Sequence, residues 1–481
     1  MNRSASFWLI WLPLIGLVAL VAAREHLNLA LDPVPLIAVL LLATFALAGI
    51  ARYPAAFIAP ALFIPWWTAE GLTHYAGFSE LTLAALAVAA GIFLRLIRSG
   101  PGAPAAPGFP ASRKGVLAFF LFVIVAYSSV AWTASPQYGG DEARTFLWLA
   151  PLMFLAPFFL VRDREDLRDF VVGIVAFALL VAAVSLRFSS SGAMGATDNP
   201  AHITKAQTIG LGLLLLLYYP AESRKTRRFV LLLLIPFLAL GLVSAEARGP
   251  LVAVLFVVCL GFFVPRLRSP LLSRRQMLIA GVVVVAAVFA LSAFWFYGAS
   301  EAKFQYKADE LIALATGSPQ AQGTAVERLQ FYRASIGAWL VRPILGWGIG
   351  GWSMFYWHQD DHHYPHNLIL QVLSEQGLVG LAALGFLLWR AFRSLRRSVA
   401  HLTVESAFLL PGFLYLLTAA MFSGDLNDNR FLWFWCGLIF SCCAVLQRSE
   451  AEKAHIWGPA YAGTAQAFNR VPVSPSPPPH Q

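Results

Sequence analysis

Long apolar runs recur along almost the whole chain, separated by short polar stretches. About fourteen of these runs approach the roughly 17–25 residues that a helix needs to cross the hydrocarbon core of a bilayer. None alternates between apolar and polar residues as the strands of a membrane barrel do. The run at 54–67 is short and rich in proline, so we expect about twelve to fourteen transmembrane helices. The predicted spans lie near residues 7–23, 34–50, 54–67, 79–97, 115–133, 144–161, 169–187, 205–220, 228–244, 250–264, 277–297, 366–389, 406–423 and 431–447.

The composition supports this interpretation and excludes a soluble protein. Hydrophobic residues make up 58% of the 481 residues and charged residues only 12%, and the mean hydropathy is +0.67. Soluble domains are about a quarter charged. The sequence therefore predicts an all-α polytopic membrane protein with one large external loop, at 298–365, that carries short helices.

The net charge of +10 follows the membrane topology. With the N-terminus in the cytoplasm, roughly two thirds of the Lys and Arg residues fall on the cytoplasmic side, as the positive-inside rule requires. This bias explains most of the basic excess without a nucleic-acid partner. It also predicts that both termini are cytoplasmic and that the large loop lies outside.

Breaks in the hydrophobic rhythm divide the chain into four predicted parts. Shorter external loops are expected between the spans, among them 134–143, 188–204 and 424–430. The four parts are an N-terminal transmembrane bundle at 1–184, a core at 185–390 that includes the large loop, C-terminal transmembrane helices at 391–448, and a Pro-rich cytoplasmic tail at 449–481 that we expect to be disordered.

The stretch from 343 to 381 joins a histidine-rich polar segment directly to an apolar helix. Ionisable groups at a membrane boundary are costly, so their presence favours a functional site. Pro365 suits the start of a helix, which places His366 and Asn367 near the first turn of the next span. A histidine there is suited to accept a proton from an attacking hydroxyl. The alternative is that His366 only caps the span and meets lipid headgroups.

Arginines gather on the same predicted side of the membrane. Arg248 lies in a tight external corner between two spans, and Arg328 and Arg333 lie on a predicted surface helix, five residues apart and so not on one face. Their planar guanidinium groups suit a phosphate or diphosphate. The alternative is that they reach toward lipid phosphates. A second polar loop would either contact the substrate or be an ordinary solvated loop. Its candidate residues are Arg187, His202 and Lys205.

The histidine-rich segment also raises the possibility of a metal site. Its ligand types suit zinc or manganese, but the spacing is not HExxH and adjacent histidines cannot easily bind one ion together. We therefore expect a solvated polar loop and no metal or other cofactor. The glycine-rich GWGIGG follows no strand, so it does not predict a nucleotide site. The candidate metal ligands in the histidine-rich segment are His358, Asp360, Asp361, His362 and His363.

Taken together, these segments resemble the O-antigen ligase and polymerase superfamily of bacterial envelope enzymes over residues 185–390. Its members carry a small-residue/Arg/Gly corner, usually with Ser before Arg, where this chain has Ala247 and hence no hydroxyl. They then have an external arginine before an aromatic helix, a Pro-x-x-Gly-x-Gly turn, a His-Asn pair, and an acidic-x-Gly-Leu-x-Gly-Leu ending. The corresponding residues here are Arg328, 343–348, His366, Asn367 and 375–381.

The resemblance implies glycan transfer at the periplasmic face of a bacterial inner membrane. The donor would be a glycan on undecaprenyl diphosphate; the acceptor would be lipid A–core in a ligase or a second lipid-linked glycan in a polymerase. By this resemblance, Arg248 and Arg328 bind the diphosphate without a metal, and His366 accepts the acceptor's proton. Further substrate contacts would come from Asn367, Arg187, Arg333, His202 and Lys205.

Ligase is favoured over polymerase mainly because of the family, and a protein acceptor stays open. A transporter of lipid-linked sugar is the competing class. Transporters usually place ionisable residues near the midplane of the membrane and show related halves. Here the middles of the spans are almost free of charge and the polar groups gather at one face, which favours an enzyme.

Overall fold

The computed structural model describes residues 53, 55–56, 88–93, 95–96, 112–189, 201–218, 224–245, 247–264, 324–398 and 407–442. Within these residues every regular element is a helix, which confirms the predicted all-α class. The elements are α7 (Arg113–Ser128), η2 (Ser129–Trp132), α8 (Pro136–Leu160), α9 (Arg164–Ser189), α10 (Ala201–Tyr218), α11 (Arg224–Phe229), η3 (Val230–Leu234), α12 (Ile235–Ser244), α13 (Arg248–Phe263), α16 (Thr324–Val341), α17 (Gly351–Tyr356), α18 (Leu368–Ser398), α19 (Leu409–Ala419) and an unlabelled helix Arg430–Cys442.

Within the described part of the chain, three stretches are long and apolar enough to cross a membrane: Arg113–Trp132, Pro136–Leu160 and Leu368–Arg396. Shorter apolar helices accompany them at Ile203–Tyr218, Val230–Ser244, Arg248–Phe263, Leu409–Ala419 and Arg430–Cys442. The predicted spans at 7–23, 34–50 and 277–297, and most of those at 54–67 and 79–97, lie outside the described residues. The total number of spans therefore stays a prediction.

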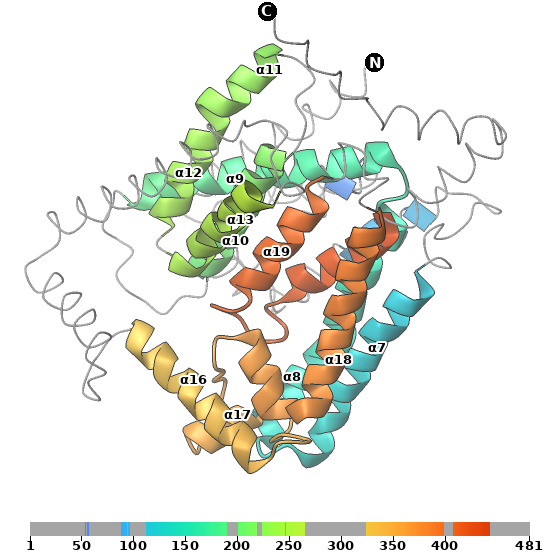
Figure 1. The fold of residues 1–481 in the computed structure, drawn as a ribbon, viewed down its shortest axis with the longest axis vertical. Helices are drawn as coiled ribbons and strands as arrows, with labels where there is room; N and C mark the ends of the chain where they lie inside the picture. Colours follow the sequence, from blue (N-terminus) through green and yellow to red (C-terminus); the bar gives the residue numbers. More distant parts are fainter. Residues whose placement is uncertain are drawn as a thin grey trace, which may run out of the picture.

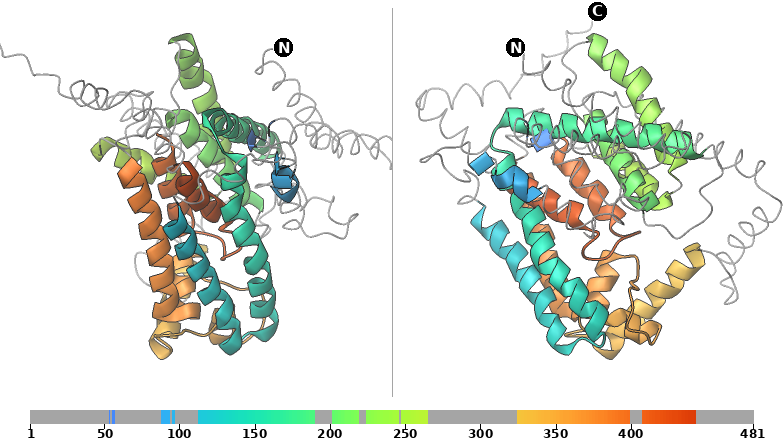
Figure 2. Two further views of the ribbon diagram at one scale, coloured as in Figure 1. Left: turned by 90° about the vertical axis from the view of Figure 1, so that its right-hand side faces the viewer. Right: turned by 180° about the vertical axis from the view of Figure 1, so that it is seen from behind.

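The long helices form one side of the molecule. Helices α7, α8 and α18 run side by side, whereas α9 runs across their direction (Figure 1). Helix α10 packs against α9, α12, α13 and α19, and the helices α16 and α17 lie at one end of α7, α8 and α18 (Figures 1 and 2). The candidate site is built at that end.

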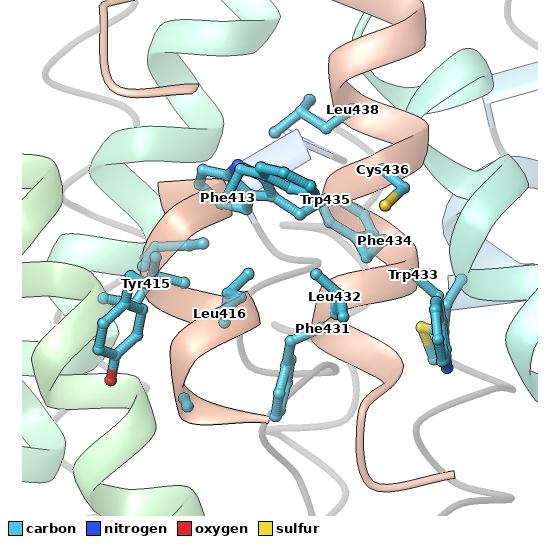
Figure 3. Packing of buried hydrophobic residues seen from close by; sticks show 14 of the residues in the cluster. Phe413, Tyr415, Leu416, Phe431, Leu432, Trp433, Phe434, Trp435, Cys436 and Leu438 are labelled. Carbon is cyan, nitrogen blue, oxygen red and sulfur yellow. The ribbon is translucent and has the colours of Figure 1, made fainter. Parts of the chain in front are cut away.

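The helix Arg430–Cys442 connects α7 and α8 with α9 through two buried indoles. Trp433 packs against phenylalanines of α7 and α8, and Trp435 packs against Phe170 of α9 and Phe408. Figure 3 shows the two indoles leaving the helix on different sides. Aromatic pairs contribute about 0.5–1.5 kcal/mol each beyond the area they bury. Such packing matters in a membrane, where lipid is as apolar as the side chains and hydrophobic burial drives association little.

One predicted loop is wrong. Residues 134–143 were expected to form an external loop, but α8 begins at Pro136 and contains most of them. The carboxylate of Asp360 caps this helix, because it accepts hydrogen bonds from the Ser135 hydroxyl and from the backbone N–H groups of Gln137 and Tyr138. This capping residue is 225 positions away along the chain, so no local sequence pattern predicts the cap.

The glycine-rich stretch does form a turn, as the sequence predicts. Gly346, Gly348 and Gly350 have φ values of 66°, 82° and 72°, a left-handed conformation that side chains with a Cβ adopt only at a cost. The turn also bonds to the connection before α8, where the N–H of Ala134 donates to Trp347 O at 2.9 Å. It therefore lies between α8 and α18.

Helix α18 is interrupted where this turn meets it. Gly377 has φ 64° and ψ −158°, so the carbonyls of Ser374 and Glu375 are freed to accept hydrogen bonds from the N–H groups of Trp347 at 3.0 Å and Gly348 at 2.7 Å. A Cβ on Gly377 would lie 2.3 Å from the carbonyl oxygen of Ile344. The Pro-x-x-Gly-x-Gly turn and the acidic-x-Gly-Leu ending are thus the two sides of one backbone interface.

Candidate functional site

His366 lies in a partly buried aromatic surrounding at this end of the molecule. Its ring centroid is 4.4 Å from that of Tyr364 and 6.0 Å from that of Phe331, against which it stacks at 18°. Its Nδ1 atom is buried and has no hydrogen-bond partner among the described residues. Burial and the neighbouring charge of Arg328 lower the pKa of His366 to about 4. The imidazole is therefore neutral at pH 7 and able to accept a proton.

Arg328 lies on α16 beside His366. It is half-buried, and its charge also opposes the rise that burial causes in the pKa values of Tyr332 and Tyr364. Arg333 lies five residues further along the same helix, hence on another face, and it is exposed. The structure therefore brings Arg328 to His366, and a contact of Arg333 with substrate stays a prediction.

A short turn after α19, residues 420–422, joins several of the predicted site segments. The carbonyl of Met421 accepts hydrogen bonds from the Tyr332 hydroxyl and from Asn367 Nδ2, each at 3.1 Å. The preceding carbonyl, of Ala420, accepts from the N–H of Leu368 at 2.9 Å. The 420–422 turn thus fixes α16 and the start of α18 relative to each other.

The same turn reaches the predicted corner at Arg248. A Cβ on Gly249 would lie 2.7 Å from Cβ of Phe422, so the first turn of α13 packs directly on the 420–422 turn. Arg248 opens α13 at this contact. The corner, the surface helix and the His-Asn pair, which are far apart in the sequence, therefore meet around one turn. In the sequence this turn is only the end of the apolar span predicted at 406–423.

The start of α18 differs from the expectation. The helix begins at Leu368, not at Pro365, and His366 precedes it with a φ of 55°. Asn367 provides the cap, because its Oδ1 accepts a hydrogen bond from the N–H of Leu370 at 3.0 Å. The amide of Asn367 therefore has two structural contacts, and its predicted contact with substrate stays a prediction.

The second predicted polar loop is only partly described. The side chains of Arg187 and His202 lie outside the described residues. Lys205 belongs to α10 and is buried, with 6% of its surface exposed. The solvated-loop interpretation is therefore wrong for Lys205, because α10 begins at Ala201, earlier than the predicted span, and turns this side chain inward.

The side chains of the histidine-rich segment point to separate partners. Asp360 caps α8, and those hydrogen bonds lower its pKa despite the opposing effect of burial. His362 Nε2 lies 3.3 Å from Asp425 Oδ2, whereas the ring of His363 packs 5.4 Å from that of Trp357. Within the described residues no group of three or more His, Cys, Asp or Glu side chains is placed to hold a metal ion.

Residues 424–430, expected to be an external loop, are largely buried. Asp425 is 5% exposed, and its Oδ1 accepts hydrogen bonds from the N–H groups of Asn427 and Asp428, each at 2.8 Å. The hydrogen bond from His362 to Asp425 raises the pKa of His362 above its usual value, although burial opposes this. A loop of seven mostly polar residues gives no sequence signal that it packs inward.

Beneath the histidines lies a buried polar contact between α8 and α18. Gln371 Nε2 donates to Glu142 Oε1 at 3.0 Å and to Glu375 Oε2 at 3.4 Å, and all three side chains are at most 3% exposed. Asn427 Nδ2 donates to the carbonyl of Glu142 at 3.2 Å. Gln371 therefore joins α18 to α8 through Glu142, and Glu375, the acidic residue of the motif, accepts a second hydrogen bond from the same amide within α18.

Comparison with known families identifies the central part of the chain. Residues 229–385 match the family Wzy_C, described as O-Antigen ligase. No curated protein matches the chain. The matched residues include Arg248, Arg328, the glycine turn and His366, and they lie within the predicted core at 185–390. The match confirms the resemblance drawn from the motifs, in a family of multi-pass inner-membrane proteins that carry out glycan transfer of the O-antigen ligase or polymerase type.

Proposed function

We propose that this protein is a ligase that moves a glycan from undecaprenyl diphosphate to a lipid A–core acceptor at the periplasmic face of the inner membrane. The observation that carries the proposal is the neutral imidazole of His366 beside the half-buried cation of Arg328. A base next to a cation suits a reaction in which a hydroxyl loses a proton while a phosphate leaves.

The reaction follows from this pairing. The acceptor hydroxyl attacks the anomeric carbon of the donor sugar and forms the new glycosidic bond, and His366 takes the hydroxyl proton. The bond between that carbon and the diphosphate oxygen breaks, and the diphosphate leaves with the bonding electrons. Arg328 and Arg248 stabilise the charge that develops on the leaving oxygen.

Donor binding would also prepare the base. In the protein alone, the charge of Arg328 disfavours the protonated form of His366. A bound diphosphate brings negative charge that offsets this cation, and so it raises the pKa of the imidazole and strengthens it as a base. The site therefore gains basicity when the donor is in place.

A polymerase of the same superfamily is the second candidate, because the same base and arginines serve any acceptor hydroxyl. The two reactions differ only in whether lipid A–core or a second lipid-linked glycan presents that hydroxyl. The family match favours glycan transfer over a transporter of the same lipid.

The experiment that tests the proposal is the lipopolysaccharide profile of a deletion strain on a gel, with wild-type, His366→Gln, Arg328→Ala and Arg333→Ala complementation. Loss of all long chains, with lipid-linked polymer accumulating, supports the ligase; single repeats still attached to core support the polymerase. We expect Arg333→Ala to restore the profile and the other two variants to fail at normal protein level. Full restoration by His366→Gln contradicts the assigned base.

A further inference from the structure

His362 and Asp425 form a second imidazole arrangement beside the proposed site. The Nε2–Oδ2 distance is 3.3 Å, and Asp425 is fixed by two backbone N–H groups that donate to its other oxygen. The His362 side chain is 60% exposed, whereas that of Asp425 is 7% exposed. A buried carboxylate therefore orients an imidazole whose remaining surface meets solvent, an arrangement that stabilises the protonated ring.

Both imidazoles lie close to the ring of Tyr364. The ring centroid of Tyr364 is 5.4 Å from that of His362 and 4.4 Å from that of His366. Among the described residues no direct hydrogen bond joins the two imidazoles, so a proton would pass through bridging water. When His362 is protonated, its charge lowers the pKa of His366, so the protonation states of the two rings are coupled.

Protonated His366 is unfavourable where it lies, because it is partly buried and faces Arg328. A base that takes a proton on each turnover must also lose it. The opposite environment surrounds His362, since Asp425 favours its charged form and its exposed surface lets a proton leave. The proton therefore moves to a more stable position when it goes from His366 to His362.

We propose that the neutral form of His362, held by Asp425, receives through water the proton that His366 takes from the acceptor hydroxyl and then releases it to solvent. This proposal rests on the proposed glycan transfer. One proton leaves the acceptor oxygen, passes to His366, then to His362, and ends on water. No oxidant, metal or further reactant is needed.

Other groups around His362 support this assignment. Asp428, from the same loop as Asp425, and Asp361, from the segment of His362 itself, both favour its protonated form. Tyr138 of α8 packs edge-on against the His362 ring at 5.2 Å.

The test measures the turnover of purified, reconstituted protein at several concentrations of imidazole buffer. We expect His362→Gln to lower kcat by less than the roughly 10²-fold that removal of a direct acid–base group costs. We also expect added imidazole to restore kcat, because a diffusible base replaces the lost ring. A purely structural role would show no dependence on buffer. His363→Gln, on the neighbouring residue that packs against Trp357, is the matched control and should leave kcat unchanged.

Asp425→Asn gives a second, activity-independent readout. The amide keeps an oxygen to accept the N–H groups of Asn427 and Asp428, so the loop keeps its turn while the charge is lost. NMR titration of histidine-labelled protein should show a lower pKa for His362 in this variant. An unchanged pKa overturns the proposed pair. Equal kcat in wild type and His362→Gln, without buffer dependence, overturns the proton route. A wild-type protein that transfers no glycan contradicts the proposed function instead.

Discussion

The glycine turn at 343–350 and the histidine segment at 358–367 lie next to each other but are held in different ways. The turn is fixed by backbone hydrogen bonds to α18 and to the connection before α8. The histidine segment is held largely by side chains, and it contains two non-glycine residues with positive φ, His358 and His366. Such conformations cost roughly 1–3 kcal/mol each and persist where surrounding structure imposes them, often at functional sites. The glycine turn therefore supports the site structurally, and the histidine segment carries the proposed chemistry.

The largest expected effect lies in the supporting region. Gly377→Val combines a positive φ with a Cβ that would lie 2.3 Å from the carbonyl of Ile344, so we expect a destabilisation of about 3 kcal/mol or more. The measurement is the amount and melting temperature of detergent-purified protein. Gly385→Ala, in the same helix with open space around it, is the control and should change stability by about 1 kcal/mol or less. Equal yields of the two variants contradict the supporting role.

In the chemical region, His366→Gln should leave the amount and melting temperature of the protein unchanged. Turnover should fall by roughly 10²–10⁴-fold, because the proton acceptor is removed. The measurement is the initial rate of glycan transfer at saturating donor. A large loss of folded protein with normal turnover per molecule would show that the role of His366 is structural.

A smaller but more specific effect is expected from Arg328→Gln. Loss of one charge-stabilising group should lower kcat/KM by about 10²-fold. The same change removes a cation beside His366, so the pKa of His366 rises from about 4. The base is active when neutral, and hence the acid limb of the kcat/KM profile should move to higher pH. Arg333→Gln, which is exposed, should move neither quantity.

The smallest effect concerns the 420–422 turn. Tyr332→Phe removes one hydrogen bond to Met421, so the free energy of unfolding should fall by about 1 kcal/mol. Tyr415→Phe removes a comparable hydrogen bond to Gln207, away from the site, and should lower the melting temperature similarly. We expect only Tyr332→Phe to reduce transfer as well, because it loosens α16 beside Arg328. Equal transfer by both variants would limit the turn to a structural role.

The sequence predicts what is local. Helical apolar spacing predicts α16, the glycines predict the turn, and the motif order brings Arg328 and His366 into one expected site. The start of α8 was missed because its cap comes from Asp360. Interactions between distant side chains leave no periodic signal, so the contacts of Gln371 with Glu142 and of His362 with Asp425 appear only in three dimensions.

The position of the 420–422 turn has a practical consequence for protein engineering. The family match ends at residue 385, yet the carbonyl of Met421 and the packing of Phe422 hold the proposed catalytic segments in register. The matched stretch is therefore not a transplantable cassette. A chimera that exchanges glycan specificity with a related enzyme must therefore take residues 407–442 from the same parent as the matched stretch. Otherwise its arginines and histidine will be positioned by a turn from another protein.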